Sequence, residues 1–446
     1  MTTLYKRGSS LLKFGSGFMA SIGAVGSGTY WGATLPELPR VSMDTSMPSV
    51  VGNTWTVTNT ANNNAAGTGA GSRTGCGLQY ALNNCALGDE LVLTAGLVFT
   101  GAFTLPDKGA GSNYVIVRTD ALPGLGIPIP GVRAAPTDAG SMPKITHDTS
   151  DENAINADFG SHHFRFTGIE IRNTPGVFSY GLFIINGNSL STSDVPHHIV
   201  VDRCYVHGDP NTDCIRGIMA NGNFIGIVDS YLSDFCARTG AFGGSGADTQ
   251  GIWSGIGQGP LKIVNNYIDA TGENIMIGGG NPATLSTDWI TADITITGNY
   301  LTKPAYMDDE SKYVCKNLFE LKLGKRVFFD SNKLIRQHTG GQLGYAITIT
   351  VRDQHDNPVQ PYFPAAEVSD VTMTNNRIED TLCFISIAGS DDGNGGVYDQ
   401  INTQPLQRLL IRNNLLTTYG ATVPVGLTRT GFLITTSPGG GLTPRA

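Results

Sequence analysis

The stretch LKIVNNYIDATGENIMIGG, residues 261–279, carries the pattern that decides the fold. Apolar Leu261 and Ile263 alternate with other residues, the pair Asn265–Asn266 follows, and a second apolar run comes after a short turn. Alternation with a period of two is typical of β-strands, because successive side chains point to opposite faces. Asn tolerates left-handed backbone geometry, so the pair indicates a tight turn. The stretch therefore predicts short strands that are joined by tight turns.

The first part of this stretch recurs along the chain. Its copies read FRFTGIEI, IVVDRCYV, IGIVDSYL, LKIVNNYI, ITITGNYL, VFFDSNKL, VTMTNNRI and LLIRNNLL. From the second copy onward, the second small polar residue falls at Cys204, Ser230, Asn266, Asn299, Asn332, Asn376 and Asn414, with spacings of 26, 36, 33, 33, 44 and 38 residues. A repeat of this length indicates a stack of similar units rather than separate domains. We expect the asparagines to form a ladder in which each side-chain amide bonds to the next coil.

A second strand-like run precedes each later copy. These runs are LFIING, GIMANG, GIWSGIG, NIMIGGG, LFELKLG, AITITVR and FISIAGS, starting at Leu182, Gly217, Gly251, Asn274, Leu318, Ala346 and Phe384. One coil then consists of a strand, a Gly-containing turn, a second strand, an Asn-containing turn and a variable loop. A β-propeller also repeats at roughly 40 residues, but its blades need hairpin turns, which are almost lacking here. We predict an all-β fold, a parallel β-helix with a dry core inside the stacked coils.

The segment from Gly77 to Pro106 is expected to close one end of the stack. It begins as a short amphipathic helix, because Leu78, Leu82 and Cys85 share one helical face. Such an N-terminal capping helix would cover the open edge of the first coil. The seven cysteines show no metal-ligand spacing, so most are expected to be buried thiols, and only Cys76 with Cys85 is considered for a disulfide.

Composition agrees with many short strands and tight turns. The 446 residues include 58 Gly and only 15% charged residues, against roughly 25% in typical globular chains. The net charge of −8 argues against nucleic acid as a partner, because phosphate binding needs clustered Lys and Arg. No apolar run reaches the roughly 18 residues of a membrane-spanning helix, so no membrane partner is expected.

The chain is expected to divide into three segments. Residues 1–50 have no clear periodicity and are interpreted as an N-terminal arm or docking segment. Residues 51–420 are the predicted β-helix, and residues 421–446 a C-terminal tail. Gly and Ser interrupt the start of the chain every few positions, which gives no clear signal peptide.

The capping segment followed by asparagine-marked coils resembles the pectate-lyase-like superfamily of right-handed parallel β-helices. The stretches KIVNNYIDATGENIMIGG, KNLFELKLGKRVFFDSN and ITVRDQ look like a group of uncharacterised bacterial β-helix proteins. This resemblance covers residues 51–419 and, with the usual chirality of parallel crossovers, implies right-handed coils. The superfamily holds lyases, glycosidases, epimerases and viral spikes, so the resemblance does not choose an activity.

Charged residues of the second runs are expected to share one face. In LFELKLG the apolar residues leave Glu320 and Lys322 pointing outward, and Glu273 and Arg352 lie in neighbouring coils. Coils stack about 4.8 Å apart, so these four residues are the candidate catalytic patch. In a lyase Lys322 or Arg352 would neutralise a substrate carboxylate, whereas in a glycosidase Glu273 and Glu320 would be the acid/base pair. The structural alternative is an ion pair between Glu320 and Lys322, with Arg352 capping a turn.

Asn274, Trp253, Thr348 and Thr350 are the candidate carbohydrate-binding residues. Thr348 and Thr350 share the outward parity of the patch, and Asn274 opens its run one coil earlier. Trp253 has the ring type that stacks on sugars, although packing on the outer surface explains it equally well.

No metal site or cofactor is predicted, and calcium is left open. The pairs His162–His163 and His197–His198 each precede a repeat strand, so we expect one ring of each pair to point in and the other out. Asp209 and Asp213 offer carboxylates for Ca²⁺, but their loop lacks the spacing of a calcium motif and is interpreted as a solvated loop.

The function predicted first is a virion-associated spike or fibre of a bacterial virus. It would be a homotrimer that presents a face to a polysaccharide or a host-surface glycan and docks on other virion proteins through residues 1–50. One alternative is an extracellular polysaccharide lyase or glycoside hydrolase, and another is a structural β-helix that decorates a surface. The expected location is therefore the virion or the outside of the cell.

Overall fold

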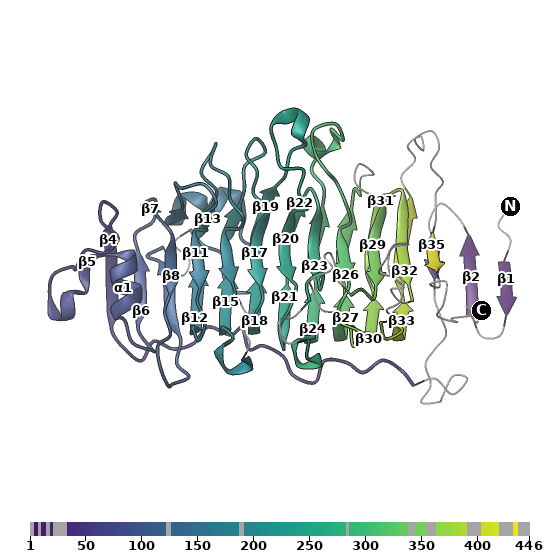
Figure 1. The fold of residues 1–446 in the computed structure, drawn as a ribbon, viewed down its shortest axis with the longest axis horizontal. Coiled ribbons are helices and arrows are strands. Elements are labelled where there is room, and N and C mark those ends of the chain that lie inside the picture. The colour runs from purple at the N-terminus through teal and green to yellow at the C-terminus, as the bar shows by residue number, and fades with distance from the viewer. Residues whose placement is uncertain are drawn as a thin grey trace.

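The chain forms a right-handed parallel β-helix in a computed structural model, which describes residues 4–7, 10–14, 18–20, 34–121, 126–186, 191–281, 285–337, 344–353, 363–389, 403–418 and 431–435. The coils stack along one axis, from α1 (Leu78–Asn84) at one end to the last strands at the other (Figure 1). Each full coil contributes one strand to each of three parallel sheets, here called sheets 1, 2 and 3.

The strands of each sheet follow one another along the axis. Sheet 1 contains β5 (Thr74–Gly77), β4 (Thr54–Asn59), β6 (Glu90–Leu93), β9 (Val115–Thr119), β12 (His162–Thr167), β15 (His197–Asp202), β18 (Asn223–Val228), β21 (Leu261–Val264), β24 (Ala292–Thr297), β27 (Gly324–Asp330), β30 (Val368–Thr374) and β33 (Gln407–Arg412). Sheet 2 contains β7 (Val98–Thr100), β10 (Lys144–Thr146), β13 (Glu170–Arg172), β16 (Tyr205–His207), β19 (Tyr231–Phe235), β22 (Tyr267–Ala270), β25 (Tyr300–Thr302), β28 (Lys333–Ile335), β31 (Arg377–Thr381) and β34 (Asn414–Thr418). Sheet 3 contains β8 (Phe103–Leu105), β11 (Ile155–Ala157), β14 (Phe183–Ile185), β17 (Arg216–Ala220), β20 (Gln250–Ser254), β23 (Glu273–Ile277), β26 (Phe319–Leu321), β29 (Tyr345–Thr350), β32 (Cys383–Ala388) and β35 (Phe432–Thr435). Short 3₁₀ turns lie at η1 (Ala70–Ser72), η2 (Pro136–Ser141), η3 (Thr192–Asp194), η4 (Gly240–Phe242), η5 (Thr287–Trp289) and η6 (Ala305–Asp308).

The core runs through the middle of the coils. Within one coil, Ile263 of β21, Ile268 of β22 and Ile275 of β23 are fully buried and belong to one continuous cluster. Equivalent residues stack along the axis, so that Ile263 pairs with Ile296 of the next coil and Ile296 with Phe329. The repeated sequence motif spans two of these strands, from sheets 1 and 2, with the asparagine pair at the corner between them. A coil therefore has three strands where the sequence pattern showed two runs.

The predicted asparagine ladder is confirmed. The backbone N–H of Asn299 donates to the Oδ1 atom of Asn332 at 2.9 Å, and the Nδ2 atom of Asn299 donates to the same oxygen at 3.0 Å. The same pair of bonds joins Asn266 to Asn299, Asn332 to Asn376 and Asn376 to Asn414. Each of these side chains is at most 3% exposed. Each corner thus satisfies a buried N–H that the turn would otherwise leave without a partner.

The two residues of each corner do different work. The first residue takes the left-handed backbone geometry, with φ of 57° at Asn265, 55° at Ser331 and 56° at Asn375. The second residue supplies the ladder amide. In the Asn-Asn pair, the first residue is thus explained by its left-handed backbone and the second by its hydrogen bonds to the next coil. In one coil Gly298 takes the first position, with φ of 66°.

The capping helix is also confirmed. Leu78, Ala81 and Leu82 of α1 are buried against the first coils. The side-chain amide of Gln79 both donates to and accepts from the backbone of Thr104 in β8, at 3.0 and 2.9 Å. These are the bonds that a further strand would make, so α1 covers the terminal edge of sheet 3.

The cysteines considered for a disulfide stay unpaired. Cys76 and Cys85 are both buried free thiols. Lys108 donates from Nζ to the carbonyl of Cys85 at 2.8 Å and so caps the C-terminal end of α1.

Residues 34–50 lie along the outer surface of sheet 1 rather than apart from the coils (Figure 1). The backbone N–H of Glu37 donates to Asp370 of β30 at 3.0 Å, and that of Arg40 donates to Asp293 of β24 at 2.8 Å. Lys262 of β21 then donates to the Oγ1 atom of Thr45 at 2.9 Å. This part of the predicted docking arm is thus bound to the chain's own β-helix.

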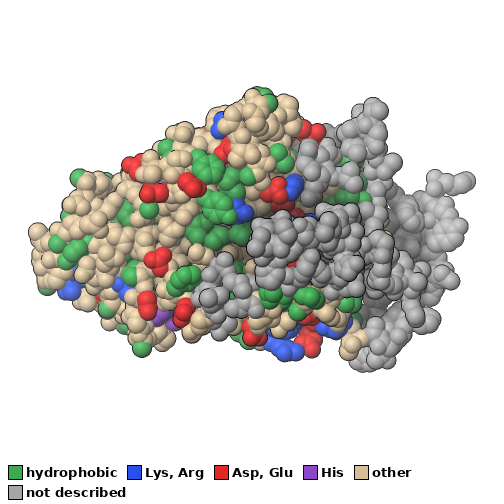
Figure 2. All heavy atoms as spheres, viewed as in Figure 1, with side chains coloured by type: hydrophobic (Ala, Val, Ile, Leu, Met, Phe, Trp, Pro, Cys, Tyr) green, Lys and Arg blue, Asp and Glu red, His purple; other side chains and the backbone are tan. Residues whose placement is uncertain are grey.

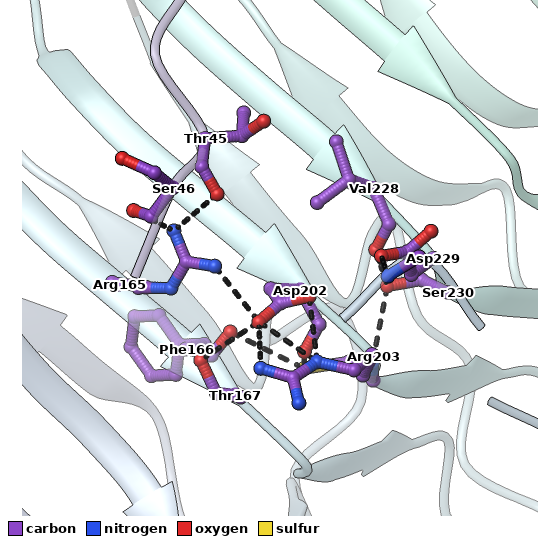
Figure 3. Close-up of polar contacts among 12 residues, drawn as sticks. Thr45, Ser46, Arg165, Phe166, Thr167, Asp202, Arg203, Val228, Asp229 and Ser230 are labelled. Carbon is purple, nitrogen blue, oxygen red and sulfur yellow. Dashed lines mark hydrogen bonds and ion pairs between the residues drawn. The ribbon is translucent and has the colours of Figure 1, made fainter. Parts of the chain in front are cut away.

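Near its C-terminal end, the arm contacts a buried cluster of ion pairs (Figure 3). Arg165 of β12 donates to the carbonyls of Thr45 and Ser46, both at 3.1 Å, and also pairs with Asp202 at 2.8 Å. Arg203 pairs with the same Oδ2 atom of Asp202 at 2.6 Å and also donates from Nε to its Oδ1 atom at 2.9 Å. All three charged side chains are at most 3% exposed, so the arm completes the pairing of charges that burial would otherwise penalise.

Both predicted terminal segments contribute strands. Residues in the predicted tail form β35, which pairs with β32 in sheet 3. In the predicted arm, β3 (Phe18–Ala20) pairs antiparallel with β34, and β2 (Ser10–Phe14) and β1 (Leu4–Arg7) extend sheet 2 further. An unpaired strand edge is an open template for such pairing. Among the described residues, no helix is long and apolar enough to cross a membrane.

Replacing Asn332 with Ala is expected to lower the free energy of unfolding by about 3 kcal/mol, since each buried group left without a partner costs roughly 1–3 kcal/mol. The groups affected are the N–H of Asn299 and the carbonyl of Ile296. Urea unfolding followed by circular dichroism measures the change. Asn83→Ala, which removes an exposed amide on α1, is the control and is expected to shift stability by less than about 0.5 kcal/mol. Equal effects of the two variants would contradict a stabilising ladder.

Candidate functional site

The outer face of sheet 3 carries one side chain per coil in a single row. The parallel register aligns Met219, Trp253, Met276, Glu320 and Thr348 in successive strands. Their sequence neighbours are core residues, so alternation along each strand turns this row outward. Trp253 and Thr348 are partly exposed, whereas Met219, Met276 and Glu320 of this row are only 8%, 6% and 4% exposed.

A second row lies where the strands of sheet 3 begin. Arg216, Gln250 and Glu273 open β17, β20 and β23, and they are in register with one another. The guanidinium of Arg216 lies 4.7 Å from the ring centroid of Tyr180 and 4.5 Å from that of Trp253. The aromatic faces thus hold a cation beside the outward row.

Apolar and charged side chains meet on this face. Figure 2 shows hydrophobic side chains gathered over the middle of sheet 3, around β17 and β20, with basic and acidic side chains beside them. Such a mixed surface is notable in a chain with 15% charged residues.

Glu273 and Glu320 form a buried carboxyl pair. Glu273 is fully buried and Glu320 is 4% exposed, and their side chains are hydrogen-bonded to each other. The Oε1 atom of Glu273 and the Oε2 atom of Glu320 are buried and receive no other hydrogen bond. A proton held between the two carboxyls satisfies both oxygens, because two carboxylates have no donor of their own.

Two lysines and an amide surround the pair. The Nζ atom of Lys316 lies 3.7 Å from the Oε1 atom of Glu273 and also pairs with Asp248. The Nζ atom of Lys322 lies 3.4 Å from the Oε1 atom of Glu320. Gln250 donates to the Oε2 atom of Glu273 at 2.7 Å.

The groups around the pair shift the pKa values of the two carboxyls in opposite directions. Burial and the charge of Glu273 raise the pKa of Glu320 to about 7. Burial also opposes ionisation of Glu273, but the charge of Lys316 and the bond from Glu320 outweigh it, so the pKa of Glu273 lies below its ordinary value. Below about pH 7 the pair therefore holds one proton.

The arrangement suits proton transfer. A group with a pKa near neutrality is an effective general acid or base, and Glu320, at 4% exposure, is the less enclosed member of the pair. Glu273 is fully enclosed. The direct contact also leaves no space between the two carboxyls for a sugar, whereas the carboxyls of a glycosidase pair stand about 5 to 9.5 Å apart.

Of the four charged residues predicted as the catalytic patch, the structure brings the side chains of Glu273, Glu320 and Lys322 together, and Arg352 joins them through its backbone. Lys322 is the ion partner of Glu320, and the backbone N–H of Arg352 donates to the carbonyl of Lys322 at 3.2 Å. The expected ion pair of Glu320 with Lys322 therefore exists as one part of a larger cluster.

The carbohydrate-binding candidates divide into two groups. Trp253, Thr348 and Thr350 are partly exposed on sheet 3. Asn274 does not lie on that face, because its side chain is fully buried and bonds to the carbonyls of Ile268 and Thr302 at 2.7 and 2.8 Å. Its amide instead bonds to the backbone of β22 and β25 in sheet 2, which corrects the prediction.

Sequence reasoning missed Lys316, Arg216 and Gln250. A signal for two of them was present, because Arg216, Gln250 and Glu273 each stand directly before the second apolar run of their coil. Lys316 comes from a loop, so only the folded chain places it beside Glu273.

The loop considered for calcium has its own pairing. Asp213 accepts from the Nε atom of Arg238 at 2.8 Å and from the backbone N–H of Ser245 at 2.7 Å. Asp209 accepts from the backbone N–H of Asn211 at 2.7 Å, as in an ordinary turn. Calcium binding here stays a prediction.

No protein-family model matches this chain, and neither does any curated protein. Solved structures with a similar fold include an alginate lyase from Paenibacillus sp. str. FPU-7, with 12% identity, a TM-score of 0.34, and coverage of 81% of this chain and 99% of that chain. The pectate lyase Pel9A has 11% identity, a TM-score of 0.34, and coverage of 84% and 79%. The Dettilon tailspike protein has 11% identity, a TM-score of 0.19, and coverage of 74% and 64%. All are parallel β-helix proteins, and at these identities the likeness concerns the fold and assigns no activity.

The carboxyl pair predicts a pH-dependent contribution to stability. The pKa of Glu320 rises from 4.5 to about 7 on folding, so the folded chain keeps a proton that the unfolded chain releases. This contribution is present at low pH and is lost as the pH rises through about 7. Glu320→Gln is neutral at every pH, and relative to the wild type it is expected to gain up to about 3 kcal/mol between roughly pH 5 and pH 8.

Urea unfolding of both proteins at the two pH values tests this expectation. Glu379→Gln on β31 makes the same chemical change away from the pair, and it should keep the pH dependence of the wild type. A constant difference between Glu320→Gln and the wild type would refute a raised pKa at Glu320.

Proposed function

We propose that the protein binds an acidic polysaccharide along the outer face of sheet 3 and cleaves it, with Glu320 as the residue that transfers the proton. The observation that carries this proposal is the Glu273–Glu320 pair, which keeps a buried carboxyl with a pKa of about 7 in the outward row of sheet 3. Burying two carboxylates side by side is costly, and the ladder and core do not require it.

The charges around the pair favour an anionic substrate. Lys316 and Lys322 act on the carboxyl pair, and Arg216 lies beside Trp253. Clustered cations in a chain of net charge −8 support attraction of a carboxylate-bearing polymer to this one face. The aromatic ring of Trp253 offers an apolar surface of the kind on which sugar rings stack.

Cleavage by β-elimination fits the geometry better than hydrolysis by the two carboxyls. In its ionised form, Glu320 takes the proton from the carbon next to the substrate carboxylate. The electron pair of that C–H bond forms a carbon–carbon double bond, and the bond to the glycosidic oxygen on the next carbon breaks. The leaving oxygen takes a proton from water, and Lys322 neutralises the charge that builds up on the carboxylate.

Incubation with acidic polysaccharides tests this function. The wild type is expected to produce unsaturated uronate, measured by ultraviolet absorbance, and Glu320→Gln is expected to lower kcat by at least about 100-fold, the range of general acid–base catalysis. The rate should rise with pH as Glu320 loses its proton near pH 7. Glu379→Gln should retain full activity. Cleavage that is unchanged in Glu320→Gln would rule out the assigned residue, and reducing sugar without unsaturated product would rule out elimination.

The setting of this activity stays a prediction from the sequence: a homotrimeric virion spike, an extracellular enzyme or a surface-decorating protein. The spike requires three copies of the chain. Size-exclusion chromatography with light scattering is expected to give the mass of a trimer, and a monomer at micromolar concentration would count against the spike while leaving the cleavage proposal intact.

A further inference from the structure

Four histidines meet at the start of two neighbouring strands of sheet 1. His162 and His163 open β12, and His197 and His198 open β15. The Nδ1 atoms of His162 and His163 are 2.7 Å apart, and those of His197 and His198 are 2.8 Å apart. The prediction that one ring of each pair points inward is therefore wrong, because both rings lie on the same side of the strand.

Left-handed backbone geometry explains this placement. Successive side chains of a regular strand point to opposite faces. His163 and His198 instead have φ of 55° and 54°, which turns the second side chain toward the first. Such values are uncommon outside glycine, and here two adjacent coils share them at the same position.

The two pairs stack into a box. The rings of His162 and His197 are parallel within 8°, with centroids 4.9 Å apart, and those of His163 and His198 are parallel within 9°, with centroids 4.4 Å apart. Single ring nitrogens of His162, His163 and His197 all lie within 4.8 Å of one another. Figure 2 shows histidine atoms at the surface near the lower ends of β12 and β15, next to acidic side chains.

One backbone contact sets the tautomer of His162. Its Nε2 atom lies 2.7 Å from the carbonyl oxygen of Gly109, so that nitrogen carries the proton and donates it. The Nδ1 atom of His162 then has a free lone pair that faces His163. A histidine that binds a metal through one ring nitrogen usually donates a hydrogen bond from the other ring nitrogen to a carbonyl or carboxylate. Asp107 adds a carboxylate 3.7 Å from the same Nε2 atom.

We propose that His162, His163 and His197 bind a divalent transition-metal ion of the Zn²⁺ class, with His198 as the neighbouring fourth imidazole. Imidazole nitrogen suits Zn²⁺, Ni²⁺ and Cu²⁺. Zinc–nitrogen bonds of about 2.0–2.1 Å in a tetrahedron place two nitrogens about 3.4 Å apart. The Nδ1 atoms of His162 and His163 need to move only slightly apart to reach this separation. The ring of His197 is parallel to that of His162, so it must tilt to direct a nitrogen lone pair at the same ion. A proton moves from Nδ1 to Nε2 on the ring that previously donated.

The ion would tie adjacent coils together. Its ligands come from β12 and β15, so binding would add a cross-link between coils to the backbone pairing. A ligand that binds only the folded state stabilises it by mass action, and the melting temperature should therefore rise with metal concentration.

Titration of the full chain, made without a polyhistidine tag and stripped by a chelator, tests the site. Zn²⁺ calorimetry is expected to show one ion per chain, and Co²⁺ is expected to give the visible absorption of nitrogen coordination. In the unmodified chain, Zn²⁺ should shift the imidazole NMR signals of His162, His163 and His197 and leave those of His147 and His207 in place. The absence of saturable binding at millimolar Zn²⁺, or shifts confined to His147 and His207, would overturn the proposal.

Two variants locate the ligands. His162→Gln keeps a donor for Gly109, and His163→Asn keeps a residue that tolerates left-handed geometry. Each is expected to weaken Zn²⁺ binding by more than about 100-fold, beyond the 10–100-fold loss seen when only an outer partner is removed. His207→Gln on β16 is the control and should bind as the wild type does. Wild-type affinity in both folded ligand variants would overturn the site, and if either variant fails to fold, the NMR shifts of the unmodified chain decide.

Discussion

The fixed register between coils is the constraint on which the rest of the structure depends. Backbone bonds between parallel strands hold adjacent coils together, but at each corner the chain must turn and a buried N–H loses its strand partner. The side-chain amide of an asparagine in the next coil replaces that partner, from Asn266 through to Asn414. A shift of one residue would break this ladder and would also turn every core side chain outward. The ladder therefore specifies the alignment as well as adding stability.

Register converts sequence separation into proximity. Glu273 and Glu320 are far apart in the chain, yet the stacking of β23 on β26 brings them into contact. The site then consists of one or two residues from each of several coils, with Lys316 added by a loop. Because its parts stand on rigid strands, the carboxyl pair remains aligned although ionisation of both members would drive them apart. The same rigidity keeps the side chains of the outward row aligned along the axis.

One backbone feature of sheet 1 serves several purposes. A residue with left-handed geometry recurs near the start of its strands, at His163, His198, Asp293, Arg326 and Asp370. In the early coils this geometry builds the histidine box. In the later coils it pairs Asp293 with Arg326 at 2.6 Å, and the carboxylates of Asp293 and Asp370 also hold the N-terminal arm. The cost of the left-handed backbone is thus offset by ring stacking at the histidines, and by ion pairs and hydrogen bonds to the N-terminal arm at the aspartates.

The periodic motif in the sequence was sufficient to predict the parallel β-helix, the capping helix and the asparagine ladder, because each follows from local alternation, turn chemistry and repeat spacing. It also indicated that Glu273, Glu320, Lys322 and Arg352 would share a face. Only the tertiary structure decided that the two glutamates touch, that Asn274 points inward, and that the histidine rings of each pair lie together. These outcomes depend on backbone angles at single residues and on loops that bring Lys316 and Gly109 into place. Such interactions join residues distant in sequence and leave no period in it.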